Sequence, residues 1–398
     1  MVSVKEHYEA FPYPERDPED ERHRLITGSP SHPVELDHFV FGGLRDWRTP
    51  LRVLVAGGGT GDGLIQIAHY LALAGHPHEI TYLDLSEASR RVAEARARVR
   101  GLEAIRFHTG SLLEAADHGE FDYIDCCGVL HHLPDPEAGF RALRTALAPG
   151  GGMGFMVYAP LGRSGVYPLQ EAFGALFADL PPKKRLKAAK AVFDRLPEGH
   201  PFKRNPHLTD HRASDAGFYD LLLHGQDRAY DVASLVDVLE RTGWALSSFT
   251  PPAAYDPGRF AQVPAGMDPV ARMALAEKLS GAMRVHIAYA VGGGAPRVAD
   301  GRDPRLVPHL IGVAPAALAR AVAEGRAVPV TTGGGRIELK LPRAAARLLA
   351  MVNGTRCLGE IAQAAGLPEA RFAALWGRAT EGLTGWGLLL YSSFLRSG

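Results

Sequence analysis

A short apolar strand that runs directly into a glycine-rich turn is the feature that most limits how this chain can fold. Residues 51–56 read Leu-Arg-Val-Leu-Val-Ala, and Gly57-Gly58-Gly59-Thr60-Gly61 follows at once. Apolar residues then recur at helical spacing from about Gly63 to Ala74. A strand, a glycine turn and a helix in this order are typical of a parallel α/β sheet, and the N–H groups of the turn converge on a ligand.

The same alternation of strands and helices continues along the chain. Further strands are predicted near residues 80–83, 105–107, 121–127, 153–158, 244–249 and 285–291. Helical patterns cover about 86–99, 136–147, 231–239 and 269–283. The fold class predicted is therefore α/β, with a doubly wound, Rossmann-like, seven-stranded sheet that is mostly parallel.

The 398 residues are too many for one average domain. We expect an N-terminal lid or arm over residues 1–50 and the sheet domain over 51–295. Within the sheet domain, the alternation of strands and helices stops at residues 160–230, which we expect to form a helical insertion on the substrate side. Gly292-Gly293-Gly294-Ala295-Pro296 reads as a linker. The hairpin and helix patterns of residues 300–398, with a glycine turn at 333–335, resemble a winged-helix unit.

The glycine turn by itself leaves the ligand open, but its spacing excludes two common ones. A dinucleotide fingerprint needs glycine at the position of Asp62, and a P-loop needs Gly-Lys-Ser/Thr, which is absent. The pattern Gly57-x-Gly59-x-Gly61 resembles motif I of class I methyltransferases that use S-adenosylmethionine (SAM). Asp84, at the end of the second strand, fits a residue that accepts hydrogen bonds from both ribose hydroxyls.

A second segment makes the resemblance specific. Residues 121–136 contain Val129-Leu130-His131-His132-Leu133 followed by Pro134-Asp135, and the later Pro149-Gly150-Gly151 completes the pattern. This run resembles the fourth-strand segment of ubiquinone-biosynthesis-like and type 11/12 methyltransferases. The resemblance covers about residues 50–160 closely and the last two predicted strands more loosely.

The resemblance implies a SAM-dependent enzyme and a set of cofactor contacts. The glycines would pack against the methionine part, Asp84 would hold the ribose, and Leu85 would flank the adenine. Ser111 stands where the family often has aspartate, so the contact with the adenine amino group is expected to be weaker. The full set of cofactor-binding candidates is Gly57, Gly58, Gly59, Gly61, Asp84, Leu85, Ser111, Leu112, Cys127, Gly128 and Tyr13.

Catalytic and substrate-binding residues are expected at the same edge of the sheet. Methyl transfer needs a nucleophile in line with the methyl group in a dry site, and a base only when the nucleophile arrives protonated. His132 and Tyr158 are the catalytic candidates, and Arg163, Tyr167 and His131 are the substrate-binding ones. Structural roles remain open for all five, and Asp125 is expected to be a buried carboxylate with a structural partner.

The N-terminal segment 7–14 is polar-aromatic, with two prolines. One interpretation makes Tyr8 and Tyr13 a lid that closes over SAM, and the other makes the segment an ordinary arm packed on the domain. The cysteines Cys126, Cys127 and Cys357 form no CxxC pair, so no metal site is predicted.

Composition bears mainly on partners. Lys+Arg and Asp+Glu number 44 each, so no global field attracts nucleic acid, and no run of about 18 apolar residues suggests a membrane span. We expect a cytoplasmic methyltransferase acting on an N or O atom of a protein side chain or small metabolite. A homodimer is left open. The alternative from another class is a SAM-responsive regulator whose C-terminal winged-helix-like domain binds DNA.

Overall fold

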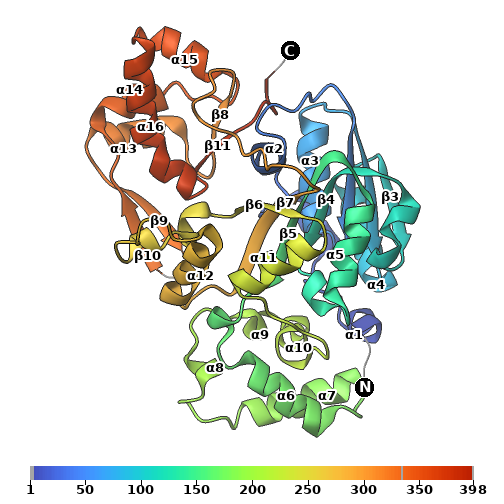
Figure 1. Ribbon diagram of the computed structural model, residues 1–398. Coiled ribbons are helices and arrows are strands. Elements are labelled where there is room, and N and C mark those ends of the chain that lie inside the picture. The colour runs from blue at the N-terminus through green and yellow to red at the C-terminus, as the bar shows by residue number, and fades with distance from the viewer. Residues whose placement is uncertain (1–3, 333–334, 397–398) are drawn as a thin grey trace.

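The computed structural model describes residues 4–332 and 335–396, and a seven-stranded sheet forms its centre (Figure 1). The strands are β1 (Leu51–Ala56), β2 (His78–Asp84), β3 (Ile105–Thr109), β4 (Phe121–Cys127), β5 (Leu147–Tyr158), β6 (Ala245–Phe249) and β7 (Val285–Val291). Their order in space is β3-β2-β1-β4-β5-β7-β6, and β7 runs antiparallel to both its neighbours. The predicted seven-stranded, mostly parallel sheet is confirmed.

Helices cover both faces of this sheet. They are α2 (Pro33–Val40), α3 (Asp62–Leu73), α4 (Glu87–Val99), α5 (Pro136–Thr145), α11 (Val232–Arg241) and α12 (Pro269–Ser280). Ser86 caps α4, because its Oγ accepts a hydrogen bond from the Ser89 N–H at 3.1 Å. Within the described residues, no helix is long and apolar enough to cross a membrane.

Successive side chains of a strand point to opposite faces of the sheet and pack in two separate hydrophobic cores. Leu54 of β1 packs in a cluster with residues of α5 and α11, whereas Val53 and Val55 pack in a second cluster with α2 and α3. Successive strand residues point to opposite faces, so one short apolar strand serves both layers. Helix α2 is thus part of the second core although it precedes the first strand.

The insertion between β5 and α11 is helical, as expected. It contains α6 (Val166–Phe177), α7 (Pro182–Phe193), α8 (Pro201–Arg204), α9 (Asp210–Ala213) and α10 (Asp215–Leu223). These helices share a hydrophobic cluster of their own, to which Phe11 of the N-terminal arm adds its ring. They gather with α1 (Val4–Ala10) at one end of the molecule (Figure 1).

Residues after the Gly292–Ala295 segment form a further cluster of elements. They are β8 (Pro308–Leu310), α13 (Pro315–Ala323), β9 (Val328–Thr332), β10 (Gly335–Leu339), α14 (Ala346–Leu349), α15 (Leu358–Ala365), α16 (Glu369–Gly385) and β11 (Leu389–Tyr391). β9 and β10 pair antiparallel, and β11 pairs with β8. Gly333 and Gly334 of the expected turn lie outside the described residues, and the winged-helix assignment and the domain boundaries stay predictions.

Candidate functional site

A cavity of about 710 Å³ lies at the carboxyl ends of β1, β2 and β4, where open α/β sheets bind their ligands. Every cofactor candidate except Gly61 lines it. The lining residues come from the glycine turn, from the segments that follow β2, β3 and β4, and from the N-terminal arm. Positions far apart in the sequence therefore meet around one space.

The glycine turn needs glycine for two different reasons. Gly57 has φ +68°, and a Cβ there would lie 2.4 Å from Cγ2 of Val129. Gly59 has φ +52°, and a Cβ there would lie 2.9 Å from the carbonyl oxygen of Tyr13. Side chains at either position would meet protein atoms and require a rarely adopted backbone. Gly61 instead begins α3 and faces Ala93 of α4, so its place is in packing rather than in the cavity wall.

Backbone N–H groups of two neighbouring turns hold the Asp84 carboxylate in place. Its Oδ2 accepts the Gly59 N–H and its Oδ1 accepts the Ser86 N–H, both at 2.8 Å. Burial raises the pKa of this carboxyl, and the two N–H groups oppose that rise. A carboxylate has about four acceptor positions, so both oxygens can still accept from ligand hydroxyls.

Leu85 and Ser111 line the part of the cavity wall that follows β2 and β3. Leu85 is 41% exposed, so its side chain is accessible to a ligand, as a residue that flanks a planar ring must be. Ser111 lines the cavity, and its Oγ accepts the Leu113 N–H at 3.2 Å, so the hydroxyl also caps the following turn. The hydroxyl hydrogen remains free to donate.

The N-terminal arm contributes to the cavity wall beside the glycine turn. Tyr8 and Tyr13 both line the cavity, and the Pro14 carbonyl accepts a hydrogen bond from Thr60 Oγ1 at 2.6 Å. Burial raises the pKa of the Tyr13 hydroxyl, which is therefore protonated at neutral pH. The arm thus lies against the glycine turn, and the choice between a lid and an arm packed on the domain stays a prediction.

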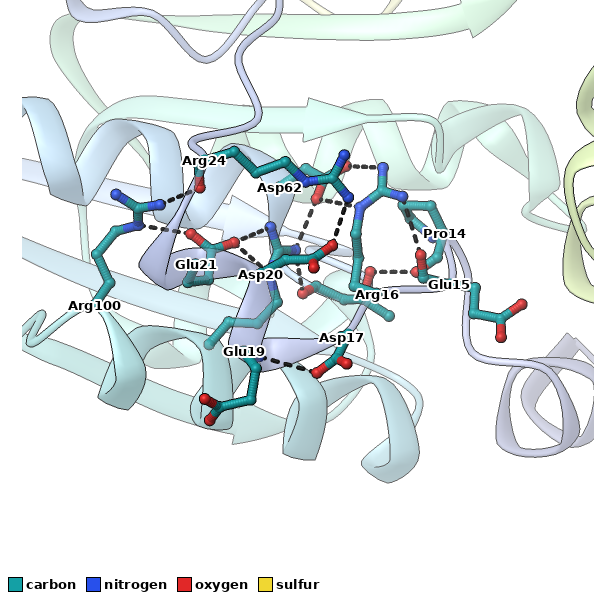
Figure 2. Close-up of polar contacts among 12 residues, drawn as sticks. Pro14, Glu15, Arg16, Asp17, Glu19, Asp20, Glu21, Arg24, Asp62 and Arg100 are labelled. Carbon is teal, nitrogen blue, oxygen red and sulfur yellow. Dashed lines mark hydrogen bonds and ion pairs between the residues drawn. The ribbon is translucent and has the colours of Figure 1, made fainter.

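A chain of ion pairs fastens the arm to the domain (Figure 2). Arg16 holds both Asp62 oxygens, at 2.9 and 2.7 Å, and Arg96 reaches Asp62 at 2.7 Å. Glu21 of the 3-10 helix η1 (Pro18–Arg22) accepts from Arg96 and from Arg100, each with a contact at 2.6 Å. Arg96 and Glu21 are 1% and 6% exposed, so these charges are largely shielded from solvent.

The other end of the cavity holds a buried carboxylate between two tyrosines. Asp220, from α10, accepts from the Tyr8 hydroxyl at 3.0 Å and from the Tyr158 hydroxyl at 3.2 Å. It is 4% exposed, and burial raises its pKa. Asp220 was not predicted from the sequence, because no sequence pattern in the insertion indicates which of its acidic residues lies beside the sheet.

His132 lies beside this carboxylate. Its Nδ1 is 3.0 Å from the Gln226 carbonyl oxygen, which can only accept, so we assign the proton to Nδ1 and a free lone pair to Nε2. One ring nitrogen of His132 lies within 4.8 Å of an Asp220 oxygen. His132 and Tyr158 both line the cavity, as expected for catalytic candidates.

The three substrate-binding candidates lie behind Tyr158 and do not line the cavity. His131 is 1% exposed, with its ring centroid 3.9 Å from that of Tyr158. The Arg163 guanidinium lies 3.5 Å from the centroid of the Tyr158 ring and donates to Asp227 and to Tyr167, each at 3.2 Å. These side chains hold Tyr158 in place.

Two groups of side chains here have the composition of metal ligands: His131, His132 and Asp227, and His132, Asp220 and His224. In the second group, His224 Nδ1 accepts the Gln226 N–H at 3.1 Å, so its Nε2 carries the proton and offers no lone pair. In the first, Asp227 already pairs with Arg163, whose positive charge opposes a cation. The absence of a metal site stays a prediction.

Comparison with protein families and known sequences gives matches around the glycine turn. A family model described as a methyltransferase domain matches residues 54–153. An uncharacterized protein of Synechococcus sp. is 34% identical over 216 residues, 52% of this chain and 50% of its own length. The ubiquinone biosynthesis O-methyltransferase of Stutzerimonas stutzeri is 33% identical over 94 residues, 23% of this chain and 39% of that enzyme. The chain thus spans half or less of these relatives.

One solved structure is similar over nearly the whole chain. PKMT2 from Rickettsia typhi, in complex with AdoHcy, has a TM-score of 0.64, covers 93% of this chain and 77% of its own, and is 14% identical. At this identity the likeness is one of fold. It extends beyond the sheet to most of the residues that follow.

Proposed function

We propose that this chain, whose residues 54–153 form a class I SAM-dependent methyltransferase domain, transfers the SAM methyl group to the nitrogen of a primary amine such as a lysine side chain. The amine acceptor is proposed from Asp220, a buried carboxylate that lines the cavity. A homodimer stays a prediction.

The cofactor end of the cavity fits SAM. Gly57, Gly58 and Gly59 line the cavity, so the backbone of the glycine turn forms part of its wall. Asp84 offers carboxylate oxygens to a pair of hydroxyls, and Leu85 offers an apolar face to a ring. SAM supplies a methyl group on a sulfonium, which is already activated for transfer.

The acceptor end suits a cation. Tyr8 and Tyr158 each donate to one oxygen of Asp220, which stabilises its charged form despite burial. An ammonium group can pair with this carboxylate. A neutral hydroxyl would leave the buried negative charge uncompensated, so the geometry favours N over O.

The amine must lose a proton before it can attack. Nε2 of His132 has the free lone pair to accept that proton, because Nδ1 is engaged with the Gln226 carbonyl. A nitrogen–carbon bond then forms as the sulfur–carbon bond breaks, and the electron pair stays on sulfur to give S-adenosylhomocysteine. Tyr8, Tyr13 and Tyr158 exclude water from this step.

A protein acceptor is favoured by the fold. PKMT2, which is similar over 93% of this chain, shares the elements that follow the sheet as well as the sheet itself. All lining residues of the cavity lie between Val4 and Gln226, so the elements after the sheet are not needed to close it and are available to a protein partner. We therefore place the amine on a lysine of a protein.

Incubation with methyl-labelled SAM and a fractionated lysate tests this function. Label is expected in protein, at lysines identified by mass spectrometry, and D220N should lower the rate at least about 100-fold because it removes the charge that binds the ammonium. Y158F should lower the rate about 10-fold. Y230F is the matched control, since the Tyr230 hydroxyl is buried, has no hydrogen-bond partner among the described residues and lies outside the cavity.

Three results would contradict the proposal in different ways. Label only in hydroxyl-containing small molecules would refute the amine acceptor. An unchanged rate in D220N would refute the role of Asp220. DNA retention with no turnover of SAM would favour the regulator.

A further inference from the structure

Four aspartates line the cavity, and three of them have evident partners or tasks. Asp62 is paired with Arg16 and Arg96, and Asp84 accepts two backbone N–H groups beside the position expected for the ribose. Asp220 accepts two tyrosine hydroxyls at the acceptor end. Asp125 remains, and the resemblance to known methyltransferases assigned it no contact with a ligand.

Asp125 lies in β4 at a point set by the sheet register. It pairs with Val55 of β1, two residues before Gly57, and so lies below the glycine turn. It is on the opposite side of β1 from Asp84, because β1 separates β2 from β4 in the sheet. A SAM molecule with its ribose at Asp84 and its adenine at Leu85 therefore extends its methionine part toward β4.

The immediate surroundings of Asp125 leave one oxygen available. Oδ2 accepts the Ser31 hydroxyl at 2.6 Å, and among the described residues no hydrogen bond reaches Oδ1. A Cβ added at Gly63, in the first turn of α3, would lie 3.3 Å from Oδ1 and 2.6 Å from Ser31 Oγ. A glycine at position 63 thus keeps the space beside Oδ1 clear, and Gln66 lines the same part of the cavity.

We propose that Asp125 binds the α-ammonium group of SAM through Oδ1 and thereby selects ligands that carry the amino-acid part. This rests on the proposed function, since it assumes that SAM occupies the cavity. Asp125 is 2% exposed, and burying its negative charge with one hydroxyl partner costs folding free energy. An ammonium group offsets that cost best, because it brings the opposite charge and hydrogen-bond donors. The raised pKa of Asp125, about 7, has burial as its cause and is consistent with a charge that lacks its counter-ion.

The test is a double-mutant cycle between the protein and the ligand, read by calorimetry on the full chain. The ligands are S-adenosylhomocysteine and its analogue in which hydrogen replaces the α-amino group. The D125N substitution should lower the affinity for S-adenosylhomocysteine about 10- to 100-fold and change the affinity for the analogue less than about 3-fold. D122N is the matched control, because Asp122 lies on the same strand and pairs with Arg52 outside the cavity.

The outcomes separate this inference from the proposed function. Wild-type protein that binds neither ligand contradicts the proposed function. If D125N lowers the affinity for both ligands equally, or lowers neither affinity, the role of Asp125 is overturned while SAM binding stands. If D125N does not fold, wild-type protein alone decides: the analogue must bind at least about 10-fold more weakly than S-adenosylhomocysteine, and equal affinity overturns the inference.

Discussion

Asp125 shows what a single buried carboxylate costs this protein. Burial raises its pKa from the ordinary 3.8 to about 7, and the hydrogen bond from Ser31 offsets only part of the effect. Between those two pH values the folded protein holds a proton that the unfolded chain has released. Stability of the ligand-free protein therefore falls as pH rises from about 4 to 7, by at most about 1.4 kcal/mol per pH unit from this group.

Thermal unfolding between pH 5 and pH 8.5 checks this. Without ligand, D125N should gain stability relative to wild type as the pH rises, because asparagine cannot acquire the buried charge. An aspartate whose folded-state pKa is lowered predicts the reverse, a D125N that loses stability relative to wild type as the pH rises. Stabilised protein with weakened SAM binding is the signature of a residue kept for its ligand.

At the scale of elements, the 3-10 helix η1 determines how firmly the N-terminal arm is held. Its Glu21 accepts from Arg96 and Arg100 in a largely buried network, whereas the adjacent Asp20 pairs with Arg24 on the surface, with side chains 46% and 60% exposed. Removing one partner of a buried pair leaves the other charge uncompensated, but an exposed pair contributes little.

We expect E21Q to lower the free energy of unfolding by about 3 kcal/mol and D20N by less than about 0.5 kcal/mol. Urea denaturation of the two variants makes this comparison. E21Q should also speed proteolysis in residues 14–24 and dissociation of SAM, because the arm forms one wall of the cavity. Similar losses in both variants would mean that the arm is not held by the buried pairs.

At the scale of the whole molecule, Asp37 of α2 joins the end of the chain to the sheet. It is fully buried and accepts from Ser392 Oγ at 2.6 Å, from the Ser393 N–H at 3.0 Å and from the Arg45 N–H at 3.1 Å. Three histidines hold the same tail: His38 accepts the Tyr391 N–H, His309 contacts the Ser392 carbonyl, and His76 contacts that of Phe394. The C-terminal elements are thereby fixed to the core of the sheet.

Hydrogen exchange tests this connection. D37N should accelerate exchange in α2 and in β8 and β11 together and lower stability by about 2 kcal/mol, because an amide nitrogen would face the donors that Asp37 now accepts. D46N is the control, since Asp46 pairs with Arg48 on the surface. Faster exchange confined to α2 would show that the tail is held independently.

The strands, the glycine turn and Asp84 could be predicted from the sequence because their signals are local. A buried strand is a short apolar run, and a turn that brings the backbone close to a ligand requires glycine at fixed spacing. The sheet brings these residues together whatever the rest of the chain does. All the cofactor candidates except Gly61 accordingly line one cavity, whereas Gly61 lies in a packing position, and their contacts with SAM stay predictions.

The contacts around Asp220 and Asp125 were decided by the tertiary structure. Asp220 reaches Tyr8 across 212 positions and Tyr158 across 62, and the pair of Ser31 and Asp125 spans 94. Arg163, Tyr167 and His131 were expected at the cavity but lie behind Tyr158. The local sequence of a loop indicates where a strand ends. The direction of the charged side chains in that loop depends on their partners, which come from the folded insertion. A sequence alone does not contain those distances.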